Sequence, residues 1–163
     1  VKKINKTIKE NLIKGNDNLA SDAIKSSQVE FVRLLSVQNL LIPLIDFALS
    51  SNNQNYGFDL FPLTAGKILN YNSYSTGEEY SWHIDADTKS PIRDIKLTCL
   101  LNLSEDSYDG GDLYLYRNKE VKVENFDVGC ATIFPSFTSH KVSKILKGER
   151  KTLAIWFWGP KFR

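Results

Sequence analysis

Short apolar runs separated by turn residues follow one another from Phe58 to the end of the chain. Apolar and aromatic side chains grouped in such short runs are typical of strands, and the Gly, Asp and Ser residues between them supply tight turns. We predict seven strands, over residues 67–71, 80–84, 95–103, 112–116, 131–134, 140–142 and 151–158. This rhythm favours an all-β sandwich or barrel of the jelly-roll type.

The chain before residue 58 has a different pattern. Residues 1–28 are polar, rich in Lys, Asn and Ser, and weakly patterned, which predicts a peripheral segment. Apolar side chains recur at helical spacing over residues 37–49, with Ser36 as a candidate N-cap. We therefore predict a mainly β (α+β) protein in one domain, with residues 1–57 as a polar and helical support and residues 58–163 as the jelly roll.

The composition excludes some classes of protein but does not indicate a function. With 42% hydrophobic, 12% aromatic and 25% charged residues, the 163-residue chain is typical of a globular domain and not of a disordered or fibrous protein. A net charge of +2 gives no global field of the kind that drives non-specific nucleic-acid binding. Basic residues gather at both ends of the chain, and we favour a solvated face over a polyanion site there.

Cysteine usage and hydropathy bear on location. Cys99 and Cys130 both lie in apolar, strand-like runs, so we expect two buried free thiols and a reducing compartment. We predict no membrane-spanning helix, because the apolar runs are shorter than the roughly 20 residues that span a bilayer, and no signal-peptide pattern opens the chain. We therefore expect a cytoplasmic protein without a membrane partner, and the sequence leaves the oligomeric state open.

Candidate chemistry lies in two histidines and an aspartate. His83 and Asp85 are two residues apart at the end of a predicted strand, so strand alternation would point both side chains to the same face. His140 is the only other histidine and comes after an aromatic run that leads from another predicted strand. Two imidazoles and one carboxylate on one face of a metal leave three positions open, which is typical of non-haem iron oxygenases. An isolated His-x-Asp pair is also common in surface turns, and that alternative weakens only because His140 and Arg150 occur later in the chain.

Arg150 is the second chemical signal. It begins the apolar run 151–156, ten residues after His140, and a guanidinium projecting inward from a strand requires a buried anion. A carboxylate held by the guanidinium fork is the natural partner. The alternative is a surface salt bridge at the end of a hairpin.

With these residues in place, the sequence resembles the prolyl 4-hydroxylase-like branch of the 2-oxoglutarate and iron(II)-dependent dioxygenases, including bacterial and phage PKHD-type hydroxylases. The resemblance covers about residues 67–163. Its segments are 74–85 (YSTGEEYSWHID), 97–103 (LTCLLNL), 109–113 (DGGDL), 134–137 (FPSF) before His140, and 150–163, beginning at Arg150.

The resemblance implies a double-stranded β-helix and a set of roles. His83, Asp85 and His140 would hold iron(II) as the catalytic centre. Arg150 would bind the distal carboxylate of 2-oxoglutarate, with Tyr74, Asn102 and Leu100 completing the co-substrate pocket. Tyr80, Trp156 and Trp82 would contact substrate, although core packing is an equal alternative for Tyr80 and Trp156. A bacterium, or a bacterial host infected by a phage, would be the setting.

The function that the resemblance implies is hydroxylation of prolyl residues in a peptide or protein, with release of succinate and CO2. Its cofactors would be iron(II), 2-oxoglutarate and O2, with ascorbate as a candidate reductant. Oxidation of a nucleobase or free amino acid is an alternative that keeps the same metal chemistry, and nucleic acid is the less favoured partner. A further alternative is a jelly-roll module that binds a metal or sugar without turnover.

Overall fold

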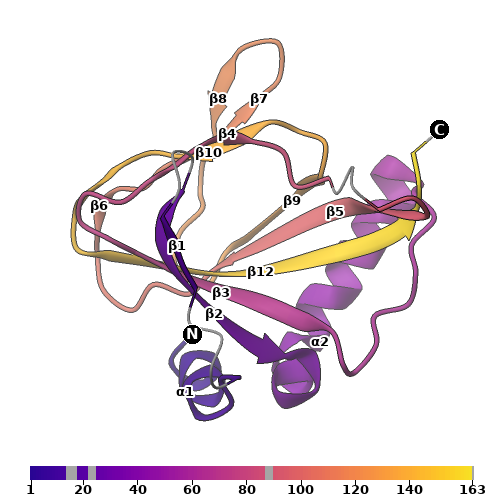
Figure 1. Ribbon diagram of the computed structural model, residues 1–163, viewed down its shortest axis with the longest axis horizontal. Coiled ribbons are helices and arrows are strands. Elements are labelled where there is room, and N and C mark those ends of the chain that lie inside the picture. Colours follow the sequence, from indigo (N-terminus) through magenta and orange to yellow (C-terminus); the bar gives the residue numbers. More distant parts are fainter. Residues whose placement is uncertain (14–17, 22–24, 87–89, 163) are drawn as a thin grey trace.

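The larger of two facing sheets forms the floor of the molecule. In the computed structural model, which describes residues 1–13, 18–21, 25–86 and 90–162, six strands pair in the order β1-β2-β3-β12-β5-β9 (Figure 1). All neighbours are antiparallel. Their bounds are β1 (Asn18–Ser21), β2 (Ser26–Arg33), β3 (Ile68–Ser75), β12 (Glu149–Pro160), β5 (Arg93–Asn102) and β9 (Ala131–Pro135).

A smaller sheet covers part of one face of this floor. It has the order β4-β10-β7-β8, and a short β11-β6 ladder lies at one end (Figure 1). The bounds are β4 (Tyr80–His83), β10 (His140–Val142), β7 (Leu113–Tyr116), β8 (Glu120–Lys122), β11 (Ile145–Lys147) and β6 (Asp109–Gly110). Two antiparallel sheets facing each other form the double-stranded β-helix, so the mainly β jelly-roll prediction is confirmed.

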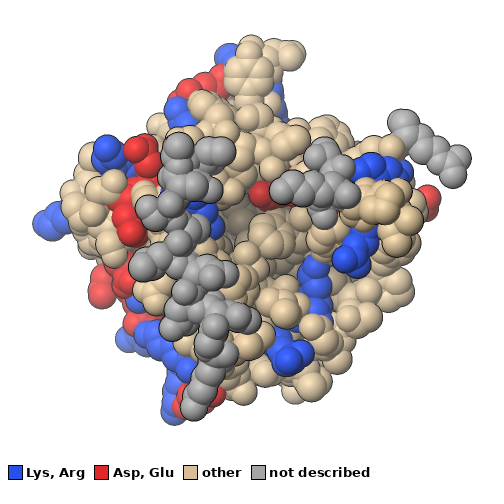
Figure 2. Space-filling view, viewed as in Figure 1, with Lys and Arg blue, Asp and Glu red and all other residues tan. Residues whose placement is uncertain are grey.

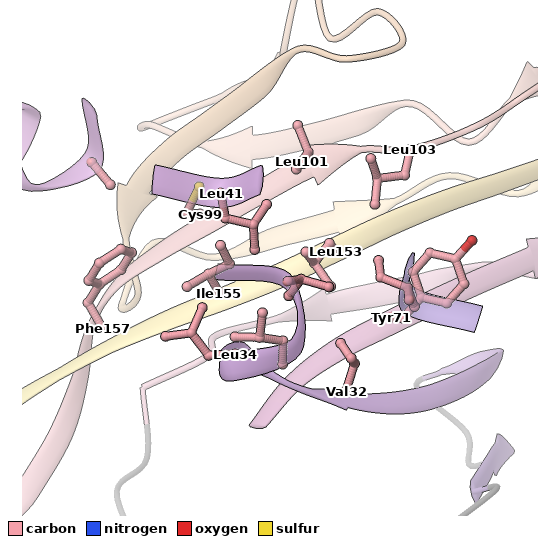
Figure 3. Packing of buried hydrophobic residues seen from close by; sticks show 14 of the residues in the cluster. Val32, Leu34, Leu41, Tyr71, Cys99, Leu101, Leu103, Leu153, Ile155 and Phe157 are labelled. Carbon is pink, nitrogen blue, oxygen red and sulfur yellow. The ribbon is translucent and has the colours of Figure 1, made fainter. Parts of the chain in front are cut away.

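Helices cover the opposite face of the large sheet. These are α1 (Lys2–Glu10) and α2 (Leu34–Ser51), which continues into a π-helical turn, η1 (Asn52–Tyr56) (Figure 1). Figure 3 shows α2 residues such as Leu34 and Leu41 packed against β12 and β5 residues such as Ile155 and Cys99. Each strand therefore sends alternate side chains into this helix-covered core and toward the smaller sheet.

The seven predicted strands are all present, at slightly different bounds. The largest extensions are those of β3, which continues to Ser75, and of β12, which begins at Glu149 and ends at Pro160. The predicted helix is longer than its apolar pattern and begins at Leu34. Ser36 is therefore not its N-cap, because it lies inside the first turn; Arg33 takes that position without a capping side-chain hydrogen bond.

The prediction that residues 1–28 are peripheral is wrong for α1 and for residues 26–28. Ile8 of α1 is fully buried in the core, and Asn5 donates from Nδ2 to the carbonyl oxygen of Leu103 at 2.8 Å. The Tyr71 hydroxyl donates to Asn5 Oδ1 at 3.2 Å. Residues 26–33 form β2, which pairs with β3 along most of its length. The sequence did not predict these elements, because their hydrophobic pattern is weak and the residues that they pack against lie far along the chain.

Two further expectations need correction. Cys99 is buried, as predicted, but Cys130 is exposed, because it lies in the turn that precedes β9. Residues Leu34–Tyr56 form the one helical stretch, among the residues described, that is long and apolar enough by length and composition to cross a bilayer. Core helices pass the same test, and α2 packs Leu34, Val37, Leu41 and Ala48 into the core.

Replacement of Ile8 by Ala tests whether α1 is part of the cooperative fold. Because the side chain is fully buried, we expect the free energy of unfolding to fall by about 2–5 kcal/mol, as for other large-to-small core substitutions. Urea unfolding would measure it. The exposed Lys3→Ala substitution in the same helix is the control, with a change within about 0.5 kcal/mol. Equal stability of the two variants would contradict the core role of α1.

Candidate active site

Pairing between β4 and β10 brings the two histidines together. His140 is the first residue of β10 and lies directly opposite His83, the last residue of β4. Their ring centroids are 4.1 Å apart. Asp85 follows β4 by two residues, and one ligand atom from each of the three side chains lies within 4.8 Å of the other two. The structure thus unites the three residues in an arrangement that a single metal ion can span.

Backbone carbonyls set the tautomer of both imidazoles. His83 Nδ1 is 2.8 Å from the carbonyl oxygen of Ser81, and His140 Nδ1 is 3.0 Å from that of Thr138. A carbonyl oxygen can only accept, so each Nδ1 carries the proton and each Nε2 presents a lone pair. Both Nε2 atoms face Asp85, at 3.5 and 3.6 Å from its carboxylate oxygens. This is the usual orientation of metal-ligating histidines.

The Asp85 carboxylate is held from the large sheet. Its Oδ2 accepts from the Thr98 hydroxyl at 2.8 Å and from the Trp156 indole N–H at 3.0 Å. Its backbone N–H donates to the carbonyl oxygen of Ser136 at 2.9 Å. Because two donors hold Oδ2, Oδ1 is the oxygen that remains available to a metal.

The protonation states also suit a cation. Burial by itself would raise the pKa of Asp85, but the neighbouring His83 and His140 rings and the hydrogen bond from the Thr98 hydroxyl together bring that pKa below its usual value. Burial lowers the pKa of His140, against the opposing effect of Asp85. An ionised carboxylate and a neutral imidazole are the forms that bind metals.

A buried guanidinium lies in the same cavity. Arg150, on β12, is 1% exposed, and its Nε and Nη2 have no hydrogen-bond partner among the described residues. Tyr108 hydrogen-bonds the side chain, and the rings of Tyr74 and Phe126 lie 5.5 and 5.6 Å from Cζ. Burying a charged donor without a partner costs free energy, unless an anion accepts its hydrogen bonds. Gly111 permits this packing, since an added Cβ would come within 2.9 Å of Arg150 Cδ.

Most of the predicted site residues line one cavity of about 70 Å³. It opens between the small sheet and β12, where Figure 2 shows a hollow in this face of the molecule. The predicted residues that line it are Tyr74, Tyr80, His83, Asp85, Leu100, His140, Arg150 and Trp156.

Two of the aromatic residues touch the histidine and aspartate directly. Tyr80 stacks on the His83 ring, with centroids 3.5 Å apart and planes at 11°. Trp156 donates to Asp85, as described above. Both side chains therefore position candidate metal ligands in addition to lining the cavity.

Asn102 does not line the cavity. Its Nδ2 donates to the Phe126 carbonyl oxygen at 2.8 Å and to the Tyr108 hydroxyl at 3.1 Å, while Oδ1 accepts from the Ser104 N–H. It lines a separate, more open hollow of about 570 Å³ that contains none of the three candidate ligands. Asn102 thus holds Tyr108, which contacts Arg150, and every polar atom of its side chain is already used.

Trp82 also lies outside the cavity. Strand alternation turns it away from its neighbour His83, and its ring packs at 6.2 Å against Tyr116, with Lys141 Nζ 4.8 Å from its centroid. A substrate contact at Trp82 therefore stays a prediction, and it would have to be made outside the cavity.

Sequence reasoning missed several residues of the site. Thr98 and Thr152 could have been found, because they share strand alternation with Leu100 and Arg150. Asn72 lies just past the predicted strand 67–71, and Lys25 comes from the segment predicted to be peripheral, so neither could have been found in this way. Lys25 forms a β-bridge with Tyr80 and donates from Nζ to Asn72 Oδ1 at 2.9 Å, which places a second cation in the cavity wall.

Comparison with known proteins identifies the class. The family model described as the 2OG-Fe(II) oxygenase superfamily matches residues 69–158, more than half of the chain. The chain belongs to this superfamily, whose members use iron(II), 2-oxoglutarate and O2.

Among individual relatives, PKHD-type hydroxylases recur. One from Synechococcus sp. strain CC9605 is 37% identical over 84 residues, which cover 50% of this chain and 37% of that protein. Another, from Acinetobacter baumannii, is 38% identical over 98 residues, covering 54% and 40%. The matches therefore span about two fifths of the relatives' length.

Solved structures agree on the fold. A Pseudomonas putida prolyl-4-hydroxylase superposes with a TM-score of 0.71 at 23% identity, over 97% of this chain and 83% of that one. A Trichoplax adhaerens prolyl hydroxylase, solved with a hypoxia inducible factor peptide fragment, gives 0.66 at 18% identity, over 96% and 74%.

Replacement of Trp156 by Phe tests the support of Asp85. Loss of the indole N–H leaves Oδ2 with one donor, so we expect iron(II) affinity to fall about 10- to 100-fold, as for other partners of metal ligands. Calorimetric titration without dioxygen would measure it. Trp82→Phe, on the outer face of β4, is the matched control and should bind iron(II) unchanged. Intact affinity in the Trp156 variant would show that the hydrogen bond has no such role.

Proposed function

We propose that this protein is an iron(II)- and 2-oxoglutarate-dependent dioxygenase that hydroxylates prolyl residues in a peptide or protein, releasing succinate and CO2. The observation that carries the proposal is a buried Arg150 in the same cavity as His83, Asp85 and His140, with two donors that have no partner among the described residues. A metal-binding module needs only the three ligands. A buried cation beside them supports an anionic co-substrate.

Each residue has a role in this proposal. His83, Asp85 and His140 would hold the metal from one side, which leaves its cavity side open. When bound, iron(II) with 2-oxoglutarate and O2 supplies the oxidation that inserts one oxygen atom into a substrate C–H bond. Arg150 would bind the distal carboxylate of 2-oxoglutarate through Nε and Nη2. Tyr74 and Leu100 would line the co-substrate, while Tyr80 and Trp156 would border the substrate.

The prolyl substrate is supported by the names of the structural relatives and by the aromatic border that Tyr80 and Trp156 form. A second candidate, a free amino acid or another small carboxylate, is favoured by one observation: Lys25 places a cation in the wall of a cavity of only about 70 Å³. Two free cysteines agree with a reducing cytoplasm. Ascorbate stays a prediction that the assay below can include.

The direct test is hydroxylation of a panel of proline-containing peptides. The protein is incubated with iron(II), 2-oxoglutarate and air, with and without ascorbate, and mass spectrometry follows the peptides. We expect the gain of one oxygen atom on proline and an equal amount of succinate. Unchanged peptides, together with oxidised free amino acids or nucleotides in a parallel assay, would overturn the prolyl substrate while leaving the oxygenase intact.

Replacement of Arg150 by Gln tests the co-substrate role. Loss of a buried charged partner should weaken 2-oxoglutarate binding about 30-fold or more, with iron(II) affinity retained. Calorimetry with Mn(II) in place of iron gives the affinity without turnover, and succinate formation gives the activity. Arg150→Lys keeps the charge without the fork and should bind with intermediate affinity.

Arg117→Gln, in the exposed turn after β7, is the matched control. It should leave 2-oxoglutarate affinity unchanged. If Arg150→Gln is folded by thermal unfolding and binds 2-oxoglutarate as tightly as the unmodified protein, Arg150 is not the anchor and the binding-module alternative gains support.

A further inference from the structure

A second tryptophan lies on β12 just beyond the cavity. Trp156 lines the cavity and Phe157 is buried in the helix-covered core. Trp158 is the next residue of β12, just past an irregularity in the pairing of β12 with β5, and it pairs with Ile95. Two residues along a strand correspond to about 7 Å. Trp158 borders its own hollow of about 340 Å³, lined also by residues 61–64, Lys67 and Arg93. This hollow, the Trp158 hollow, is therefore close to the cavity along one strand.

Two cations lie against the Trp158 ring. Arg93 Cζ is 4.7 Å and Lys67 Nζ is 5.1 Å from the ring centroid. Among the residues that the structure describes, neither cation forms an ion pair, and no acidic residue lines the hollow. Figure 2 shows basic side chains on the side of this face where β5 begins and β12 ends. The acidic residue next to Arg93 on β5, Asp94, pairs with Lys161 at 3.4 Å. Among the described residues, the positive charge that lines the Trp158 hollow therefore has no acidic partner.

Lys67 and Arg93 repel each other. Burial first, and then the charge of Arg93, lowers the pKa of Lys67 to about 8. An anion between the two groups would relieve this repulsion. The contrast with Lys141 is informative: it also lies over aromatic rings, those of Trp82 and Tyr114, but Glu120 pairs with it at 3.0 Å. An unpaired cation on a tryptophan is therefore not the general rule in this protein.

We propose that the Trp158 hollow is a subsite that binds the carboxylate of an Asp or Glu side chain of the substrate polypeptide. The inference rests on the proposed function, since it places the oxidised residue in the cavity and the acidic residue over Trp158. An extended chain advances about 3.3 Å per residue, so the acidic residue lies roughly two to four residues from the oxidised one. Lys67 and Arg93 are thus specificity-determining residues outside the catalytic centre.

Paired peptides test the subsite without requiring turnover. Each peptide has a central proline, and the residues two to four positions away on both sides are Glu in one peptide and Gln in the other. Fluorescence anisotropy of labelled peptides measures affinity with Mn(II) and 2-oxoglutarate and without dioxygen. We expect the Glu peptide to bind about tenfold more tightly at low ionic strength. The difference should shrink as salt screens the charges.

Substitution of Lys67 and Arg93 tests whether the preference for the Glu peptide arises from the Trp158 hollow. The double variant Lys67→Gln, Arg93→Gln should bind both peptides with the affinity that the unmodified protein has for the Gln peptide. Lys147→Gln, on β11, which pairs with β6, removes one exposed charge outside the Trp158 hollow and should keep the preference. Thermal unfolding checks that each variant is folded, and succinate formation without peptide should be the same in all of them.

The outcomes separate this inference from the proposed function. Equal or undetectable binding of the two peptides, or a preference that survives the double variant, overturns the subsite even if proline is hydroxylated. A preference that the double variant loses supports the subsite, even if no proline is oxidised and the prolyl substrate fails. Tighter, Lys67-dependent binding of a single-stranded oligonucleotide than of the Glu peptide would overturn the assignment to a polypeptide carboxylate in favour of phosphate.

Discussion

Antiparallel pairing of β4 with β10 is the constraint on which the candidate site depends. It sets His83 opposite His140, and the chain then needs only two more residues to bring Asp85 to the same place. The three side chains belong to the small sheet and the segment that follows β4. The donors to the carboxylate, Thr98 and Trp156, belong to the large sheet. The centre therefore lies where the two sheets meet, and hydrogen bonds to Asp85 link them.

Buried charge gives this interior its chemical character. Asp85 and Arg150 both lie out of water, where charges are costly unless they are paired. Asp85 has partners within the protein, whereas Arg150 has two donors without one among the residues described. A core selected for stability alone would not retain that arrangement. The unpaired cation is thus the feature that most clearly distinguishes a site for an anionic ligand from structural packing.

Prediction from sequence succeeded where short-range patterns were strong. The strands after residue 67 were found because apolar runs and turn residues alternate there, and His83 and Asp85 were placed on one face by strand alternation. It failed at α1 and β2, whose burial depends on residues such as Tyr71 and Leu103 far along the chain. It also failed at Cys130, whose apolar neighbours suggested a buried strand but which lies in an exposed turn. Asn102 and Trp82 lie outside the cavity that the other predicted site residues line, so their predicted roles stay predictions.

The amino-acid sequence by itself determined the sheet-rich architecture, the three candidate ligands and the inward-pointing Arg150, because these depend on strand alternation and residue chemistry. Only the tertiary structure decided which side chains support them. Thr98 and Trp156 donate hydrogen bonds to Asp85, and Lys25 lines the cavity. Lys67 and Arg93 both lie against the Trp158 ring. Each of these contacts joins segments that are distant in sequence. Strand alternation tells which face a residue occupies, but it does not tell which other strand will lie opposite.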